Sequence, residues 1–256
     1  IYRVRTLGVE NLPKGGALLV CNHVSYVDTL ILQIACPRPI RFIAYEAFHQ
    51  KWWLGWVLRI FGVIPISAKH AKDAIRATAK DLKAGELVCV FPEGQLTRTG
   101  ALMGLRKGFE LMARQGEVPV VPVFLDSLWG SIFSFADNTF FWKIPRKWPY
   151  PALVNFGKPI PADAANTTVA RQALLDLGEE AFQQRHELKG NLGHACFKSL
   201  ARQPWRPLIV DRFPKRRVLS RGMTLAIAIA LSRRWDQTIH SQRVGIVLPP
   251  GAGGVL

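Results

Sequence analysis

Short apolar runs alternate with amphipathic segments along the first 160 residues of the chain. The apolar runs are rich in Val, Ile and Phe and are only four to seven residues long, so the pattern predicts buried strands. These strands are expected at residues 17–21, 41–44, 62–66, 87–91, 118–124 and 152–156. Because strands that alternate with helices usually pair in parallel, we predict an α/β fold with a largely parallel sheet and flanking helices.

Helical periodicity is clearest over residues 71–84, where one apolar stripe is followed directly by a glycine that can end the helix. Further helices are expected at residues 29–35, 106–115 and 169–188, the last with Thr168 as its N-cap. In an α/β layered fold, functional groups lie on the loops at strand ends. The loops after the predicted strands are therefore the place to look for chemistry.

The composition changes in the last quarter of the chain. We expect a first domain over residues 1–201, followed by a basic, proline-containing linker at residues 202–221. The remaining residues, 222–256, contain one short helical pattern and one short apolar run, too little to bury a core of their own. The chain begins without a methionine and breaks off in a glycine-rich stretch, so we interpret it as a fragment.

The chain is strongly basic, with 34 Lys and Arg against 18 Asp and Glu and a formal net charge of +16. Such a balance indicates a polyanionic partner, which could be nucleic acid, anionic lipid or a phosphorylated substrate. Eight tryptophans and fourteen phenylalanines accompany the basic residues. Because Trp beside Lys or Arg suits the headgroup region of a bilayer, the composition favours a membrane surface over nucleic acid.

Membrane contact is predicted at Trp52, Trp53 and Trp56, which lie between Lys51 and Arg59. The alternative is that these tryptophans belong to a core helix. No run reaches the roughly 18 to 20 apolar residues that a spanning helix needs, so we expect peripheral attachment. The four cysteines have no disulfide or metal spacing and are interpreted as buried thiols, which indicates a reducing compartment such as the cytoplasm.

The strongest chemical signal is the segment from Asn22 to Asp28, between a predicted strand and a predicted helix. His23 and Asp28 can pair only if His23 lies in the turn and Asp28 in the first helical turn, because five residues of continuous helix would put them about 140° apart. If paired, Asp28 fixes the tautomer of His23, and the free ring nitrogen can accept a proton from an alcohol. The alternative is a helix-capping histidine and a first-turn aspartate favoured by the helix dipole.

A second polar cluster follows the strand that ends at Phe91. Glu93 and Gly94 come directly after that strand, and Glu93 could pair with a cation or orient a substrate hydroxyl. Arg98 lies downstream and offers a guanidinium suited to a phosphate, while Arg106 and Lys107 open a predicted helix whose positive end would reinforce an anion site. For each basic residue the alternative is a solvated surface position.

Other chemistries lack support in the chain. There is no GxSxG, HExxH or Walker loop, no GxGxxG after a strand, and no His or Cys spacing typical of a metal site. We therefore expect neither a metal nor a bound cofactor.

Together these motifs resemble the glycerolipid acyltransferase family over about the first 190 residues. Residues 22–28 match its His-x4-Asp motif, residues 91–94 its third motif and residues 118–123 its fourth. The resemblance implies the fold of that family, His23 as general base with Asp28 as its partner, and Glu93 and Gly94 at the acceptor. The second motif, at residues 62–68, lacks the arginine that the family commonly uses to hold the acceptor's phosphate, and Lys69, Arg98 or Lys107 could replace it. The departure favours a larger headgroup than that of lysophosphatidic acid.

The tail, residues 222–256, resembles the opening of an acyl-adenylating synthetase. An acyltransferase followed by such a domain is the layout of the bacterial bifunctional acyl-ACP synthetase and 2-acylglycerophosphoethanolamine acyltransferases. This resemblance implies acyl-ACP or acyl-CoA as co-substrate, a lysophospholipid acceptor, no nucleic acid partner, and a place on the cytoplasmic face of the inner membrane. Alternative hypotheses are a lysophosphatidic-acid acyltransferase, a thioesterase that uses water as acceptor, and a basic lipid- or nucleic-acid-binding module without catalysis.

Overall fold

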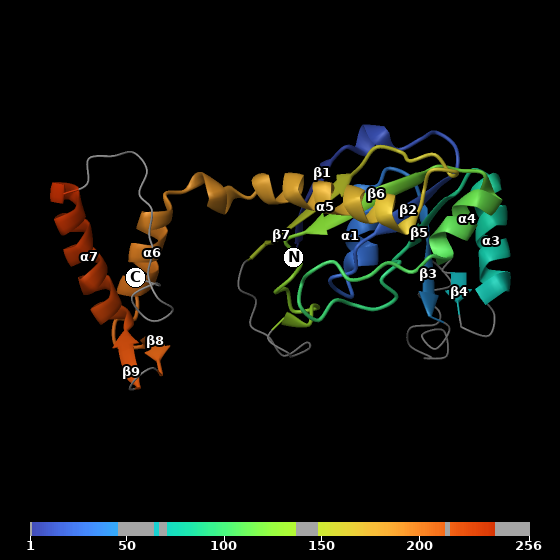
Figure 1. The fold of residues 1–256 in the computed structure, drawn as a ribbon. Helices are drawn as coiled ribbons and strands as arrows, with labels where there is room; N and C mark the ends of the chain where they lie inside the picture. The colour runs from blue at the N-terminus through green and yellow to red at the C-terminus, as the bar shows by residue number, and fades with distance from the viewer. Residues whose placement is uncertain (1, 46–63, 67–70, 137–147, 213–215, 239–256) are drawn as a thin grey trace. The chain divides into compact units, whose positions relative to one another are not determined.

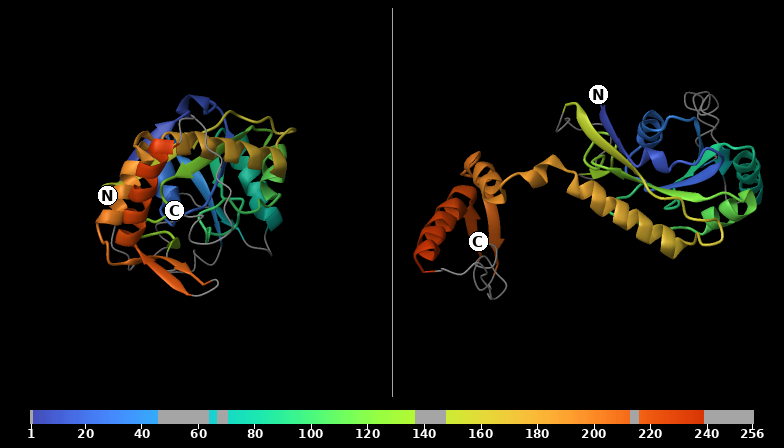
Figure 2. Two further views of the ribbon diagram at one scale, coloured as in Figure 1. Left: turned by 60° about the vertical axis from the view of Figure 1, so that its left-hand side comes forward. Right: turned by 90° about the horizontal axis from the view of Figure 1, so that it is seen from above.

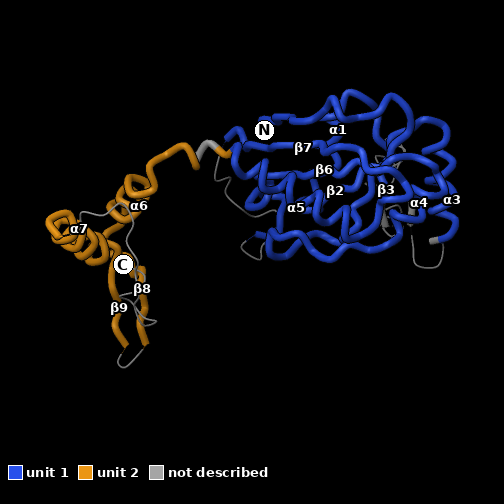
Figure 3. Tube along the Cα trace, turned by 45° about the horizontal axis from the view of Figure 1, so that its top comes forward, with its two compact units in different colours: residues 1–184 blue, residues 185–256 orange. Residues whose placement is uncertain are grey.

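The computed structural model describes residues 2–45, 64–66, 71–136, 148–212 and 216–238 of the 256-residue chain. The chain divides into two compact units, residues 1–184 and 185–256, which Figure 3 shows in different colours. The division after Gln184 falls earlier than the end of the first domain that the composition indicates, residue 201. The first unit contains the whole of the large sheet and the two polar segments that begin at residues 22 and 91.

A seven-stranded sheet forms the centre of the first unit, in the order β1-β7-β6-β2-β5-β3-β4 (Figure 1). Only the β6–β7 pair is antiparallel, so the prediction of a largely parallel sheet is confirmed. The strands are β1 (Tyr2–Leu7), β2 (Ala17–Cys21), β3 (Ile40–Tyr45), β4 (Ile64–Ile66), β5 (Leu87–Val90), β6 (Val120–Asp126) and β7 (Tyr150–Phe156).

Strand β1 was not among the predicted strands. It pairs with β7 at one edge of the sheet, and Arg3 and Arg5 alternate with the half-buried Tyr2 and Val4. An edge strand with one solvated face shows no continuous apolar run, so the criterion that identified the buried strands does not detect it.

Helices cover both faces of the sheet, as Figure 2 shows. All five residues of β2 are fully buried, and its side chains alternate between two hydrophobic cores. One core includes α1 (Asp28–Ala35), and the other includes α3 (Ala71–Lys83), α4 (Gly108–Gly116) and α5 (Thr167–Gln183). Because β2 lies in the centre of the sheet, its carboxyl end and the loop that follows lie in the middle of the row of strand ends.

Two helix boundaries differ from the sequence prediction. Helix α4 begins at Gly108, two residues later than expected, and the N–H of Arg106, ahead of the helix, donates to the carbonyl of Pro92 (2.9 Å). Helix α5 ends at Gln183 rather than at residue 188. Its N-cap is Asn166, whose side chain accepts from the N–H groups of Thr168 and Val169, so the assignment of Thr168 as the cap was wrong.

In the second unit the described residues form α6 (Leu192–Ala201), a hairpin of β8 (Pro207–Asp211) and β9 (Arg217–Ser220), and α7 (Arg221–Thr238). Residues 202–221, expected to be a linker, therefore contain the hairpin. Among the described residues of this unit only Thr224 is buried. Cys196 is exposed, contrary to the expectation of a buried thiol, whereas the other three cysteines are buried.

Within the described ranges, no helix combines the length and hydropathy required to cross a bilayer. The short 3₁₀ helices Val9–Asn11 and His186–Lys189 complete the elements. Trp52, Trp53 and Trp56 lie outside the described residues, as does the short apolar run expected after residue 242.

Candidate active site

The polar motifs lie side by side at the carboxyl ends of the central strands. Strand β2 pairs in parallel with β5 on one side and β6 on the other, with Val20 opposite Val90 and Cys21 opposite Val123. The loops that start at residues 22, 91 and 127 therefore begin at the same end of the sheet, where the carboxyl ends of β2, β5 and β6 lie. This is the strand-end position at which α/β proteins build ligand sites.

His23 and Asp28 are in contact, as their pairing requires. Asp28 is the first residue of α1, His23 lies in the turn before it, and the His23 Nδ1 atom is 2.8 Å from Asp28 Oδ2. An ionised carboxylate only accepts hydrogen bonds, so the shared proton belongs to Nδ1. In the neutral imidazole this leaves the opposite ring nitrogen, Nε2, unprotonated and able to accept a proton.

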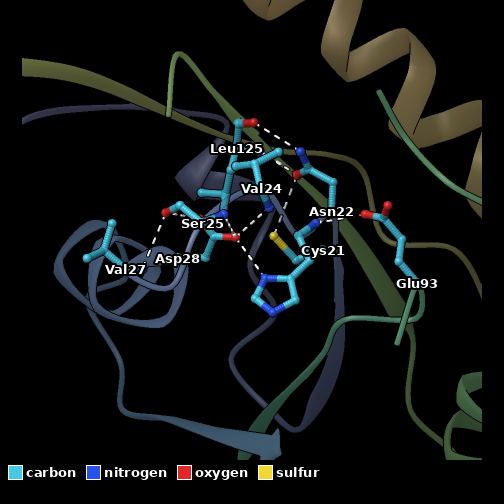
Figure 4. Close-up of polar contacts among 9 residues, drawn as sticks. Cys21, Asn22, Val24, Ser25, Val27, Asp28, Glu93 and Leu125 are labelled. Carbon is cyan, nitrogen blue, oxygen red and sulfur yellow. Dashed lines mark hydrogen bonds and ion pairs between the residues drawn. The ribbon is translucent and has the colours of Figure 1, made fainter. Parts of the chain in front are cut away.

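The Asp28 carboxylate is held by four donors and is fully buried. Besides His23, the backbone N–H groups of Val24 (2.7 Å) and Ser25 (3.0 Å) donate to Oδ2, and the Ser25 hydroxyl donates to Oδ1 (2.8 Å). Figure 4 shows these contacts of Asp28 with Val24 and Ser25. This network stabilises the charged carboxylate and fixes its orientation toward the histidine.

The imidazole ring of His23 is also positioned by an aromatic neighbour. It stacks on Phe91, with ring centroids 4.1 Å apart and an interplanar angle of 18°. One-fifth of the His23 side chain remains exposed. The ring is thus held by Asp28 and by Phe91, yet it is open to a substrate.

Asn22 ties the end of β2 to β6. Its amide nitrogen donates to the carbonyl of Leu125 (3.0 Å), and its amide oxygen accepts from the N–H of the same residue (2.7 Å), as Figure 4 shows. The side chain is buried, and both of its polar groups are satisfied by this pair of bonds. Asn22 therefore fixes the start of the loop that carries His23.

Glu93 joins its own loop to the loop that carries His23. It is buried, its Oε1 accepts from the backbone N–H of His23 (2.7 Å), and its Oε2 accepts from the N–H of Met103 (2.8 Å). Burial raises the pKa of Glu93 above its ordinary value, while these two hydrogen bonds act in the opposite direction. The contacts support a positioning role for Glu93, which joins its own loop to the histidine loop.

We expect Glu93→Gln to destabilise the protein at neutral pH by about 1–3 kcal/mol, because the amide nitrogen must face a backbone N–H that the carboxylate accepted. Because burial raises the pKa of Glu93, folding favours the protonated form. The stability that this proton binding contributes in the wild type is fully present below the ordinary glutamate pKa of 4.5 and is lost as pH rises through the raised pKa of the folded state. The variant should lack this contribution. Urea unfolding of both proteins between pH 4 and 7 measures the difference, and parallel pH profiles would contradict it.

The two cationic residues predicted for the site, Arg98 and Lys107, have different surroundings. The Arg98 guanidinium carbon lies 4.1 Å from the centroid of the Phe135 ring, a cation–π contact. Lys107 is the exposed N-cap residue of α4. Gly94, at φ +72°, lies directly beneath the guanidinium of Arg106, the residue that was expected to open a helix together with Lys107.

The segment after β6 lies beside the histidine loop and is hydrogen-bonded to it. The N–H of Tyr26 donates to the carbonyl of Phe133 (3.1 Å), and Trp129 packs so closely on Gly100 that a Cβ there would lie 2.9 Å from its indole atoms. Sequence reasoning did not assign these contacts to the site. The only sequence signal was the high density of aromatic residues after Asp126.

Comparison with known proteins agrees with this geometry. Residues 3–126 match the family model described as Acyltransferase. Among curated proteins, the 1-acyl-sn-glycerol-3-phosphate acyltransferase of Bacillus subtilis is 32% identical over 122 residues, which cover 46% of this chain and 60% of that protein. The enzyme of the same name from Saccharomyces cerevisiae is 31% identical over 126 residues, which cover 47% of this chain and 42% of the yeast protein.

A solved structure shows the same fold. The crystal structure of the 1-acyl-sn-glycerophosphate (LPA) acyltransferase PlsC from Thermotoga maritima superposes with a TM-score of 0.54 at 23% identity, covering 71% of this chain and 73% of that one. The first unit thus has the α/β fold of this acyltransferase. Its segment 3–126 is related in sequence to enzymes named acyltransferases, and the chain spans less than two thirds of the curated relatives described above.

Proposed function

We propose that this chain transfers a fatty acyl group from an acyl thioester to the free hydroxyl of a lysophospholipid, with His23 as general base. The observation that carries the proposal is the 2.8 Å contact between His23 Nδ1 and the buried Asp28 carboxylate, at the sheet edge where β2, β5 and β6 end. The match to the Acyltransferase model over the same segment supports the same chemistry.

In the proposed reaction, Nε2 of His23 removes the proton from the acceptor hydroxyl as its oxygen attacks the thioester carbonyl carbon. Asp28 stabilises the imidazolium that forms. When the tetrahedral intermediate collapses, the carbon–sulfur bond breaks, and the departing thiolate takes the proton from Nε2. General-base catalysis contributes about 10²- to 10⁴-fold, and holding the two substrates in register contributes much of the remainder.

Two acceptors have support. The relatives named above act, by their names, on 1-acyl-sn-glycerol-3-phosphate, and they favour a lysophosphatidic acid acceptor. The missing arginine of the second motif favours a larger headgroup, such as that of 2-acylglycerophosphoethanolamine. Only residues 64–66 of that motif belong to the described part of the chain, so the choice depends on the acceptor experiment.

The remaining parts of the proposal concern the donor and the location. We infer that the donor is acyl-ACP or acyl-CoA, that no bound cofactor takes part, and that residues 222–256 are the start of an acyl-adenylating domain. We also infer peripheral attachment to the cytoplasmic face of the inner membrane through Trp52, Trp53 and Trp56. The net charge of +16 supports attraction to an anionic surface.

An acceptor series tests the proposed function. Transfer from a labelled acyl thioester is measured in detergent micelles with lysophosphatidic acid, 2-acyl lysophosphatidylethanolamine, or no acceptor. We expect diacyl product that depends on acceptor concentration, and the acceptor with the higher kcat/KM identifies the headgroup. Binding of both lipids without any product would favour a non-catalytic binding module instead.

A further inference from the structure

We propose that Arg106 binds the phosphate group of the lysophospholipid acceptor, an inference that rests on the proposed function. Arg106 lies near the end of the loop that joins β5 to α4, and Phe91 is the first residue of that loop. Its backbone N–H donates to the carbonyl of Pro92 (2.9 Å), so the loop closes on its own beginning. This bond brings the guanidinium back to the turn that follows β5.

Gly94 provides the surface on which the guanidinium lies. A Cβ on this residue would be 2.7 Å from both Cζ and Nε of Arg106 and 3.1 Å from Nη2. The glycine also adopts φ +72°, a conformation that other residues rarely take. Any other side chain at position 94 would push the guanidinium away, so the turn and the arginine fit each other as a unit.

The Arg106 charge is available to a ligand. Its side chain is exposed, and no ion pair found among the described residues involves it. Other arginines of the first unit have partners: Arg41 pairs with Asp81, Arg171 donates to the carbonyl of Met103, and Arg98 lies over the Phe135 ring. Arg106 is therefore a better anion-binding candidate than Arg98.

The position of Arg106 relative to the base suits an acceptor. Gly94, on which its guanidinium lies, is the neighbour of Glu93, and Glu93 Oε1 is 2.7 Å from the backbone nitrogen of His23. The cation and the imidazole are thus both anchored to one hydrogen-bonded pair of loops. A lysophospholipid carries its phosphate on the same glycerol unit as its free hydroxyl, so one molecule can reach both groups. The planar guanidinium fork suits two phosphate oxygens.

The test compares acceptors with and without phosphate in the full 256-residue chain. Arg106→Ala is expected to raise the KM for lysophosphatidylethanolamine and for lysophosphatidic acid by about ten- to a hundredfold, the equivalent of one charge-assisted contact, with kcat little changed. With monoacylglycerol, which has no phosphate, kcat/KM should be the same in variant and wild type. A rise in KM for lysophosphatidic acid alone would show that Arg106 recognises a phosphomonoester. A rise for lysophosphatidylethanolamine alone would show that it recognises a phosphodiester.

Arg114→Ala is the matched control, because Arg114 is an exposed arginine of α4 away from the loop. It should behave as wild type. Gly94→Ala should raise the acceptor KM as Arg106→Ala does, and the double variant should show no further rise, since both changes remove the same contact. An unchanged acceptor KM in Arg106→Ala, or an equal loss with monoacylglycerol, would overturn the proposal.

A binding measurement separates this inference from the proposed function. Calorimetric titration of His23→Ala protein with a short-chain lysophospholipid should show binding that is weakened in the His23→Ala, Arg106→Ala double variant. If the wild type fails to transfer acyl groups but this difference is found, the acyl-transfer proposal fails and the phosphate site stands. Equal binding by the two variants would refute the phosphate site, whatever the wild-type activity.

Discussion

His23→Ala is expected to lower kcat for acyl transfer by about 10²- to 10⁴-fold, the usual contribution of a general base. The reason is geometric: Nδ1 is engaged with Asp28 at 2.8 Å, the ring stacks on Phe91, and only Nε2 is left to accept the hydroxyl proton. The KM for the acceptor should change little, because the proposed phosphate contact lies on the neighbouring loop. Steady-state kinetics with a saturating acyl thioester measures the effect.

A suitable control is His194→Ala, which removes an exposed histidine from α6 in the second unit. Its kinetics should match those of the wild type. Circular dichroism and thermal unfolding should show that both variants remain folded, since His23 contributes its backbone, not its ring, to the contact with Glu93. A folded His23→Ala protein with wild-type kcat would eliminate the general-base role.

Asp28→Asn is expected to reduce kcat by about a thousandfold or more. The amide oxygen can still accept from the N–H groups of Val24 and Ser25, and its nitrogen can donate to the Ser25 hydroxyl, so the fold can survive. The negative charge that stabilises the imidazolium is lost, however. The kcat of the folded variant, measured beside that of the wild type, tests this expectation.

Asp73→Asn provides the matched comparison, because Asp73 is an exposed aspartate in the first turn of α3, as Asp28 is a buried one in the first turn of α1. This control should keep wild-type activity and lose at most about 1 kcal/mol of stability, the contribution of an exposed charge in the first turn of a helix. By contrast, Asp28→Ala removes all acceptors from two buried N–H groups and should cost about 1–3 kcal/mol of unfolding free energy for each. Near-wild-type turnover in folded Asp28→Asn would mean that the pair does not act as described.

The His23–Asp28 contact could be predicted because it is local. Both residues belong to one strand-to-helix connection, and the requirement that Asp28 open the helix follows from helical geometry alone. The strand that precedes them, β2, was equally clear, since burial on both faces produces a continuous apolar run. Strand order was not accessible in this way, because β5 and β6 flank β2 from positions about 70 and 100 residues away along the chain.

The residues whose surroundings were predicted least well depend on contacts between distant segments. The backbone contacts of Glu93 could not be predicted: it is buried between the N–H groups of His23 and Met103, and the first of these lies 70 residues away. Sequence reasoning placed Arg106 with Lys107 at a helix start that could hold an anion, but the packing of Arg106 on Gly94 could not be predicted. That contact accompanies the bond from the Arg106 N–H to the carbonyl of Pro92, which lies earlier in the chain.

The fate of a labelled acyl group tests the central claim most directly. The wild-type chain is incubated with an acyl thioester labelled in its acyl group, at increasing concentrations of lysophospholipid, and the label is followed into diacyl lipid and free fatty acid. Transfer to the lysophospholipid hydroxyl predicts that the label appears in diacyl lipid and that any hydrolysis falls as the acceptor is added. Release of the label as free fatty acid at every acceptor concentration would contradict the account and would identify a thioesterase.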